Sequence, residues 1–260
     1  MLHRLVAFAL LPGALMLSPG PSSAQGSELH AARQALGFER PSELLVEFEY
    51  TGGLGARGEG ADTARGTGRF LLRQPGSYRL EFFRKGPRAT SHQVSQEHLG
   101  VFTRWWTRSG RTQIVEFDAA GLASARKRLQ REMMVYLSAL LLADVPFLSY
   151  EARRNEYVVT SALGSSAYFT LQNLQVSLFR YERARPVPIL IAPGAKTVAI
   201  PERMQPASAR VEDFRSVGTG RLPHVLRSTY EEGWEDITIR RYVLEGGLTE
   251  TSFAVPKPRK

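Results

Sequence analysis

The chain has 260 residues, with 34 lysine and arginine residues against 25 aspartate and glutamate residues, and no cysteine. The lack of cysteine excludes disulfides, thiolate metal sites, cysteine nucleophiles and the acylated cysteine that tethers a bacterial lipoprotein. The positive balance favours anionic partners such as lipid headgroups, lipopolysaccharide or acidic proteins; an arginine-rich composition without functional meaning explains it equally well.

Residues 1–24 have the pattern of a secretory signal peptide. His3 and Arg4 precede an apolar run, and small residues ending at Ala24 form a cleavage site. The run is too short to span a bilayer, which disfavours the alternative of an uncleaved anchor. We therefore expect a periplasmic mature chain that starts at Gln25, carries no lipid anchor and meets no nucleic acid.

A short helix is predicted over residues 27–36 and a strand over residues 42–50, where apolar side chains alternate. A glycine-rich stretch, residues 51–68, follows. Its segment 53–58 matches the dinucleotide-binding fingerprint by letter, but a polar run follows it where that fingerprint needs a helix. A hairpin loop is therefore favoured over a cofactor site, and no cofactor is expected.

Residues 66–84 predict an antiparallel hairpin. Pro75 and Gly76 form a tight turn between two strands in which large apolar side chains alternate with polar ones. A further unit over residues 90–117 is predicted to hold a strand running from Leu99 to Trp106, a turn at 108–111 and a strand at 112–117. Sequential antiparallel pairing is the economical topology.

The longest helical pattern covers residues 119–144 and is capped by Asp118. Apolar residues recur at helical spacing, while Arg126, Lys127, Arg128 and Arg131 make its first half basic.

Short strands are predicted after this helix, at 157–161, 167–171, 189–192, 197–200, 209–215, 222–230 and 236–242, then a closing segment at 248–256. Prolines are frequent over residues 185–206, so strands there would be edge strands or loops. Residues 257–260 form a basic tail.

These elements predict one domain over residues 25–256, mainly β with helices. A single antiparallel sheet of about ten strands would curve strongly as its strands twist, with the internal helix and the N-terminal helix covering its concave face.

The titratable residues indicate no catalytic or metal site. The histidines lack metal-ligand spacing, and no nucleophile motif occurs. Glu231, Glu232, Glu235 and Asp236 form the densest acidic cluster. A solvated hairpin tip is favoured there over a carboxylate pair or a calcium site.

Large apolar side chains on consecutive strands and on the long helix suggest that the curved sheet encloses an apolar hollow, which would bind acyl chains. The alternative, an ordinary packed core, is equally compatible with the pattern. The predicted lining residues are Phe48, Phe70, Leu72, Tyr78, Leu80, Phe82, Phe102, Trp105, Met133, Leu137 and Leu140.

Two sets of motifs resemble a known family. The hairpin has glycines at 66 and 68, a basic residue and a proline at 73 and 75, and an aromatic strand that starts at Tyr78-Arg79. The C-terminal part has Phe214, then Gly220-Arg221-Leu222-Pro223, then a strand at 237–242, and a final Phe253-Ala254-Val255-Pro256. These residues resemble the periplasmic lipoprotein-carrier family and the broader superfamily of outer-membrane lipoprotein-sorting proteins.

The resemblance implies a LolA-like half-barrel of antiparallel strands, covered by helices, with a hydrophobic cavity for acyl chains. One departure is Gln74, which stands where the carrier has an arginine before the proline.

The sequence therefore predicts a non-catalytic, monomeric carrier or binding protein for a lipid or acylated ligand, possible lipoprotein cargo included. Arg73, Arg79 and Arg84, or the basic start of the long helix, would contact an anionic headgroup, and transient contact with a membrane surface would follow. The alternative is an interaction or sensor module on the same fold, with an envelope or outer-membrane protein as partner.

Overall fold

The computed structural model describes residues 23–37, 42–57, 63–85, 90–108, 110–142, 145–153, 156–184 and 203–256. Most of the predicted signal peptide, the strands expected at 189–192 and 197–200, and the basic tail lie outside these residues. Helix α1, Ser23–Leu36, begins two residues before the expected mature start at Gln25.

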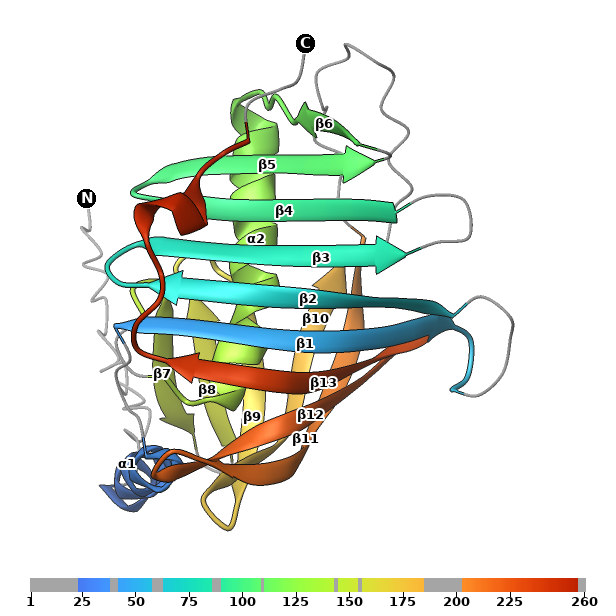
Figure 1. Ribbon diagram of the computed structural model, residues 1–260. Coiled ribbons are helices and arrows are strands. Elements are labelled where there is room, and N and C mark those ends of the chain that lie inside the picture. The colour runs from blue at the N-terminus through green and yellow to red at the C-terminus, as the bar shows by residue number, and fades with distance from the viewer. Residues whose placement is uncertain are drawn as a thin grey trace, which may run out of the picture.

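Thirteen strands within the described residues form a single antiparallel sheet (Figure 1). The first six strands pair in sequence, and so do the last seven. Their bounds are β1 Glu43–Leu54, β2 Ala64–Arg73, β3 Ser77–Lys85, β4 Thr90–His98, β5 Val101–Arg108, β6 Arg111–Ile114, β7 Leu148–Arg153, β8 Glu156–Ser161, β9 Ser166–Gln172, β10 Gln175–Ala184, β11 Met204–Val217, β12 Gly220–Tyr230 and β13 Gly233–Leu244.

The two runs of strands are joined where β1 pairs with β13, near opposite ends of the chain. Val46 lies opposite Tyr242 and Tyr50 lies opposite Ile237 in this ladder, which has one irregularity between Glu47 and Phe48. The sheet therefore runs continuously from β6 to β7, and β1 and β13 are central strands.

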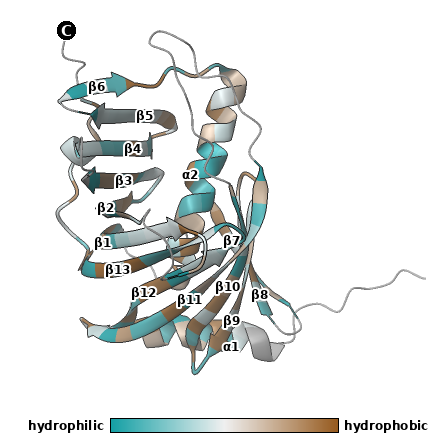
Figure 2. Cartoon of the chain, turned by 90° about the vertical axis from the view of Figure 1, so that its right-hand side faces the viewer, coloured by the Kyte–Doolittle hydropathy of each residue, from teal (hydrophilic) through white to brown (hydrophobic). Residues whose placement is uncertain are grey.

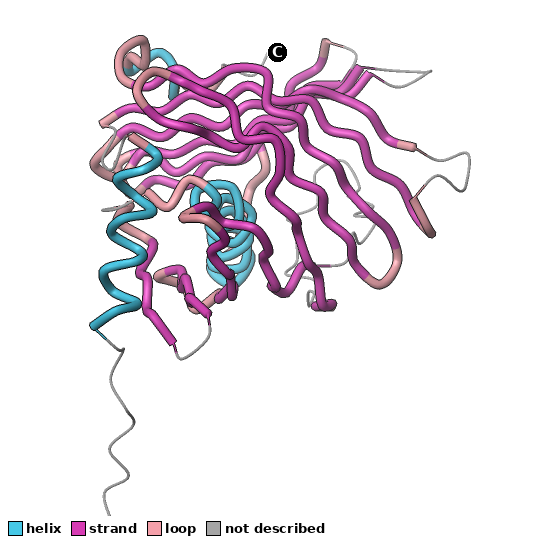
Figure 3. Tube along the Cα trace, turned by 90° about the horizontal axis from the view of Figure 1, so that it is seen from below, coloured by secondary structure: helices cyan, strands magenta, loops and turns pink. Residues whose placement is uncertain are grey.

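The sheet curls around helix α2, Ala119–Ala139, which connects the two runs. Figure 2 shows α2 between the limb formed by β1 to β6 and the limb formed by the later strands, and Figure 3 shows it inside the curve. Asp118 caps its first turn by accepting a hydrogen bond from the Gly121 backbone nitrogen at 2.7 Å. The helix ends earlier than predicted because the chain turns at Leu141, whose φ is 49°.

Helix α1 packs beside β12 and β7 at one end of the curved sheet (Figure 1). Leu29, Ala32 and Leu36 on one of its faces join the main core. Arg33 Nε donates a hydrogen bond to the Leu141 carbonyl oxygen at 3.0 Å, which ties α1 to the end of α2.

A C-terminal strap, defined here as residues 248–256, crosses the convex face of the sheet and contains the 3₁₀ helix Glu250–Phe253 (Figure 1). Leu248 and Phe253 pack with Leu71 in a small cluster separate from the main core. Arg79 Nη1 donates to the Ser252 carbonyl oxygen at 2.7 Å, and Gln96 Nε2 donates to that of Phe253 at 2.8 Å.

The structure confirms the predicted fold class, a mainly β chain with one curved antiparallel sheet and covering helices, but the sheet has thirteen strands instead of about ten. Strands β4, β7 and β10 were not predicted. Leu99 was wrongly placed in a strand; it lies in the turn between β4 and β5 with φ 49°. Within the described residues, neither helix is long and apolar enough to cross a membrane.

Candidate functional site

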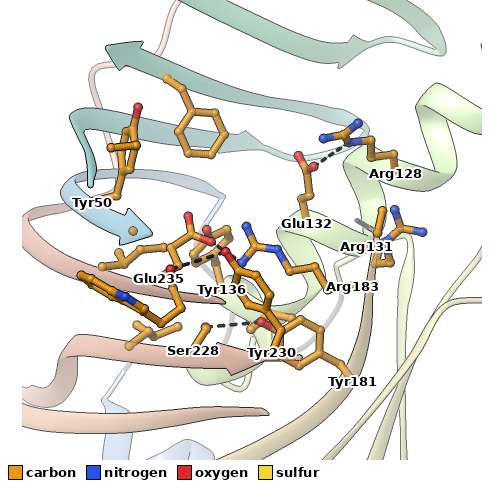
Figure 4. A pocket seen from close by; sticks show the side chains of 18 of the residues that line it. Tyr50, Arg128, Arg131, Glu132, Tyr136, Tyr181, Arg183, Ser228, Tyr230 and Glu235 are labelled. Atoms are coloured by element: carbon orange, nitrogen blue, oxygen red, sulfur yellow. Dashed lines mark hydrogen bonds and ion pairs between the residues drawn. The ribbon is translucent and has the colours of Figure 1, made fainter. Parts of the chain in front are cut away.

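A cavity of about 500 Å³ opens on the concave side of the sheet, between α2 and both runs of strands. We call it the concave pocket. Its walls come from β1, β2, β3 and β4 on one side, from β10, β12 and β13 on the other, and from the middle of α2 (Figure 4). The pocket therefore joins segments that are far apart in the sequence.

Alternation along the strands determines which side chains reach the pocket. Successive strand residues point to opposite faces, so Phe82 and Arg84 of β3 share the concave face. Glu235 and Ile237 of β13 share it by the same rule, and both line the pocket.

Aromatic side chains form much of the wall. Tyr50 and Phe82 meet edge to face with ring centroids 5.5 Å apart, and Tyr136 of α2 stacks on the core residue Phe48 at 5.9 Å. Burial raises the pKa of the Tyr136 hydroxyl well above its usual value, so this group stays protonated at neutral pH. The wall thus offers apolar surface together with neutral hydroxyl groups.

A partly buried ion pair lies in the wall of the pocket (Figure 4). Arg183 of β10 pairs with Glu235 of β13, and its guanidinium carbon lies 4.6 Å from the centre of the Tyr230 ring. Burial alone would lower the pKa of Arg183, but the Glu235 carboxylate and neighbouring tyrosines raise it above its ordinary value. The two opposite charges largely cancel within the protein.

The α2 wall is basic. Arg128 Nε lies 2.8 Å from Glu132 Oε1, one helical turn away, and Arg131 is buried with its Nη1 3.5 Å from the sulfur of Met204. Burial would raise the pKa of Glu132, but the charges of Arg128, Arg104 and Arg131 and the hydrogen bond from Arg128 lower it. Glu132 is therefore ionised at neutral pH and is surrounded by arginines.

Of the residues expected to line the hollow or to contact a headgroup, the structure places Phe82 and Arg84 in the wall of the concave pocket, together with Arg128 and Arg131 from the basic start of the long helix. Nine others are packed in the main core: Phe48, Phe70, Leu72, Tyr78, Leu80, Phe102, Met133, Leu137 and Leu140. Side chains thus fill much of the space between the sheet and α2, and the pocket occupies only part of it.

Trp105, Arg73 and Arg79 lie on the convex face instead. Trp105 is three residues from Phe102, so alternation points the two side chains to opposite faces. The Arg79 guanidinium carbon lies 5.0 Å from the centre of the Trp105 ring. Arg73 lies 2.5 Å from Glu250 of the strap. On this face the two arginines bind the protein's own carboxylates and backbone, away from the pocket.

The sequence indicated the arginines on one side of the pocket, Arg84, Arg128 and Arg131, but not the ion pair between Arg183 and Glu235. Glu235 was read as part of a solvated hairpin tip, whereas its side chain reaches Arg183; its neighbour Asp236 pairs with Arg57 at 2.6 Å. The sequence did contain a signal for Glu235: it is two residues from Ile237 on the same strand, so the two side chains share a face. Arg183 has no comparable signal, because it borders a stretch that the sequence marks only as proline-rich.

No protein-family model matches the sequence, and a comparison with curated proteins finds no match. Solved structures do match. A LolA superfamily protein from Nitrosomonas europaea has a TM-score of 0.50 at 10% sequence identity, covering 89% of this chain and 97% of that chain. A DUF1329 family protein from Desulfovibrio piger has a TM-score of 0.51 at 11% identity, covering 90% and 98% respectively.

A putative outer membrane lipoprotein-sorting protein domain from Vibrio parahaemolyticus reaches a TM-score of 0.49 at 11% identity, covering 87% of this chain and 94% of that one. The first comparison shows that the chain has a LolA-like fold, as the motifs around Gly66 and Gly220 predicted.

Proposed function

We propose that this LolA-like chain is a non-catalytic periplasmic protein that binds or carries a lipid or acylated ligand in the concave pocket. The pocket is the observation that carries the proposal. Its volume of about 500 Å³ lies within the roughly 300–1,000 Å³ of small-molecule sites. Both limbs of the sheet and α2 contribute walls, so an acyl chain bound there would lose part of its contact with water.

The composition of the wall fits an amphiphile. Phe82, Val135 and Ile237 offer apolar surface, and each methylene group buried against such surface contributes about 0.8 kcal/mol. Hydroxyl and charged groups, such as those of Ser228 and Arg84, lie in the same wall and would orient the polar end of the ligand.

The periplasmic location follows from the signal-peptide pattern of residues 1–24 and from the absence of cysteine. Cleavage near Ala24 would leave α1 almost complete. The likeness of the chain to a LolA superfamily protein supports the same reading at the level of the fold.

The test is lipid content and lipid binding of protein purified from the periplasm without detergent. We expect lipid that organic solvent extracts and mass spectrometry identifies, and we expect the delipidated protein to bind a fluorescent fatty-acid probe. Protein that carries no lipid, binds no probe and purifies with a stoichiometric envelope protein would overturn the proposal and favour an interaction module.

A cavity-filling variant locates the site. Ala184 lies in the pocket wall, so Ala184→Trp should reduce probe affinity by about tenfold or more, because the indole occupies the space of the ligand. Ala120 is exposed at the start of α2 and outside the pocket wall, so Ala120→Trp is the matched control and should bind as the wild type does. Circular dichroism establishes that both variants are folded.

A further inference from the structure

We infer that the ligand of the concave pocket is an amphiphile with an uncharged head that carries several hydroxyl groups, of the glycosyl or glyceryl kind, and that this head binds against β10 and β12. The inference rests on the proposed function and adds the chemical class of the ligand. We call Tyr181, Ser228 and Tyr230 the hydroxyl cluster; all three line the pocket, and Figure 4 shows them together beneath Arg183 and Glu235.

The pairing of β12 with β13 sorts the pocket wall into an apolar row and a polar row. Leu226 lies opposite Ile237, and Ser228, two residues further along β12, lies opposite Glu235. All four residues line the pocket. Residues two apart on a strand share a face and lie about 7 Å apart. An amphiphile that lies along β12 therefore passes from apolar to polar contacts within its own length.

The apolar row continues onto β1 and β3. Ile237 lies opposite Tyr50, and the Tyr50 ring meets Phe82 edge to face, with centroids 5.5 Å apart. Leu226 and Ile237 are themselves buried, so they form a closed apolar floor against which an alkyl chain can lie. A tail placed on this row leaves the head of the ligand beside the hydroxyl cluster.

The hydroxyl cluster forms a hydrogen-bonded chain that ends in a donor. Arg183 donates to the Tyr181 hydroxyl oxygen, and Tyr181 donates in turn to Ser228 Oγ at 3.3 Å. Burial raises the pKa of Tyr181 and of Tyr230 above the usual value, so both hydroxyl groups are protonated at neutral pH. Among the described residues Ser228 has no acceptor for its own hydroxyl hydrogen, so a ligand hydroxyl can continue the chain.

The charges beside the hydroxyl cluster are matched. Arg183 and Glu235 form an ion pair whose side chains are 29% and 15% exposed. An ion next to such a pair is attracted by one partner and repelled by the other, while it still loses part of its hydration. A hydroxyl group has no charge to desolvate and can both donate and accept a hydrogen bond. This end of the pocket therefore favours an uncharged head.

A buried amide next to this end of the pocket gives independent support. Gln205 of β11 lies opposite Arg183 of β10, so its side chain points to the same concave side of the sheet. Gln205 is 2% exposed, and neither of its amide atoms has a hydrogen-bond partner in the part of the chain that the structure describes. Such an amide destabilises the protein. A head with several hydroxyl groups that reaches past Arg183 would supply both an acceptor and a donor.

The experiment compares four ligands with the same twelve-carbon chain: dodecyl glucoside, 1-dodecanoylglycerol, dodecanoate and dodecyltrimethylammonium. Each displaces the neutral dye Nile red from delipidated protein, at concentrations below those at which the ligand forms micelles. We expect the two polyols to bind about tenfold more tightly than either ion, a difference of about 1.4 kcal/mol. The stronger of the two polyols identifies a glycosyl or a glyceryl head.

Two variants assign the preference to these residues. Ser228→Ala removes the end of the hydroxyl chain and should weaken the binding of the polyols about threefold or more, with the affinity for Nile red unchanged. Gln205→Leu should weaken it as well, and should also raise the melting temperature of the ligand-free protein, because the buried amide without partners is gone. A purely structural role of Gln205 would change the melting temperature alone.

The matched control is Ser216→Ala. Ser216 is exposed on β11 and lies outside the pocket wall, so this variant should bind all four ligands as the wild type does. Circular dichroism verifies that each variant is folded.

Binding of either ion as tightly as the polyols, or a polyol preference that survives both Ser228→Ala and Gln205→Leu, would overturn the inference and leave lipid binding intact. Failure of every ligand to displace the dye, together with an absence of extractable lipid, would instead overturn the proposed function.

Discussion

Glu81 is a fully buried carboxylate on the convex face of β3, and arginines surround it. Arg69 Nε lies 2.6 Å from its Oε2, Arg79 forms a second ion pair, and His92 Nε2 lies 3.5 Å away. Burial alone would raise the pKa of Glu81, but the hydrogen bonds and positive charges of these neighbours lower it. The folded state therefore holds Glu81 ionised.

The first prediction concerns this charge. Glu81→Gln should lower the free energy of unfolding by about 3–5 kcal/mol at neutral pH, because Arg79 remains buried without its counter-charge. Urea denaturation measures the loss. Glu47→Gln is the control; its carboxylate is partly exposed and lies 3.8 Å from Arg241, so the change should cost less than about 1 kcal/mol.

The second prediction is the pH dependence of the same pair. A pKa lowered by folding stabilises the protein above the unfolded value of about 4.3, and this contribution is lost as the pH falls through the folded value. The wild type should therefore lose stability below about pH 4.3, and Glu81→Gln should lose less. Parallel stability curves for the two proteins between neutral and acidic pH would contradict this assignment.

Glycine at position 68 is required by space, not by backbone conformation. A Cβ there would overlap the Phe48 ring and would lie 2.7 Å from the Glu81 carbonyl oxygen. This explains one glycine of the motif that links the chain to its fold. The motif is visible in the sequence, but its cause is a neighbouring strand whose ring lies over the glycine.

The third prediction tests this close approach. Gly68→Ala should reduce stability by about 1–3 kcal/mol, because the added methyl group overpacks the core. Gly26 lies in the first turn of α1 and has nothing within 4 Å of its Cβ position, so Gly26→Ala should change stability by less than about 0.5 kcal/mol. Thermal unfolding should show a clear loss for Gly68→Ala and almost no shift for Gly26→Ala.

Alternation within single strands was the part of the site that the sequence could predict. It correctly separates Phe82 from Glu81, but it also contradicts the grouping of Phe102 with Trp105, which are an odd number of residues apart. Tyr136 lies on the apolar stripe of α2, and no sequence pattern distinguishes a pocket wall from solid core. Periodicity determines a face, whereas a cavity depends on which side chains fail to fill it.

At the level of elements, the C-terminal strap explains why the convex face of β2 to β4 is polar and yet buried. Phe253 is 2% exposed and stacks on His98, with ring centroids 5.2 Å apart. The strap covers Arg79 and Gln96, and its carbonyl oxygens accept a hydrogen bond from each of them. The sheet thus has a second, smaller packed layer on its outer side.

The same arrangement explains why β4 was not predicted. Its sequence, TSHQVSQEH, contains one large apolar residue, Val94, and shows no apolar alternation. Gln96 and His98 contact the strap, and Gln93 faces the concave pocket, so both faces of this strand are polar. A strand whose partners are polar on both sides gives no periodic signal.

The fourth prediction concerns the strap. Phe253→Ala should lower the free energy of unfolding by about 3 kcal/mol, because it empties the centre of the small outer cluster. Val255 is exposed on the same segment, so Val255→Ala should change stability by less than about 0.5 kcal/mol. Equal, small effects from both variants would mean that the strap does not stabilise the sheet.

At the level of the whole molecule, the ladder between β1 and β13 holds the two runs of strands in one sheet. The sequence predicted antiparallel pairing of neighbours, which is correct within each run. It could not predict that β13 returns to β1, because no local pattern encodes contacts between residues nearly 200 positions apart. The long helix α2 and the resemblance to a half-barrel family were the only indirect signals.

The fifth prediction tests this ladder. Thr238 pairs with Glu49 on one side and Val225 on the other, so its backbone N–H lies in a ladder whichever way it points. Thr238→Pro should therefore cost at least about 3 kcal/mol and can abolish folding. Gln113 lies on the edge strand β6, and Gln113→Pro should leave a folded protein with a modest loss measured by urea denaturation.

Strand β13 is the last strand in the chain and pairs with the first, so the central ladder of the sheet forms late in folding. Before β13 (Gly233–Leu244) has folded into the sheet, β1 and β12 each have an unpaired edge. Backbone groups at such an edge can pair with a strand of another chain and start aggregation. Strand pairing between residues that are far apart in the sequence slows folding, because a long loop must close first. A chain truncated before Gly233 should therefore expose two sheet edges in place of the central ladder and should aggregate more readily than the full chain.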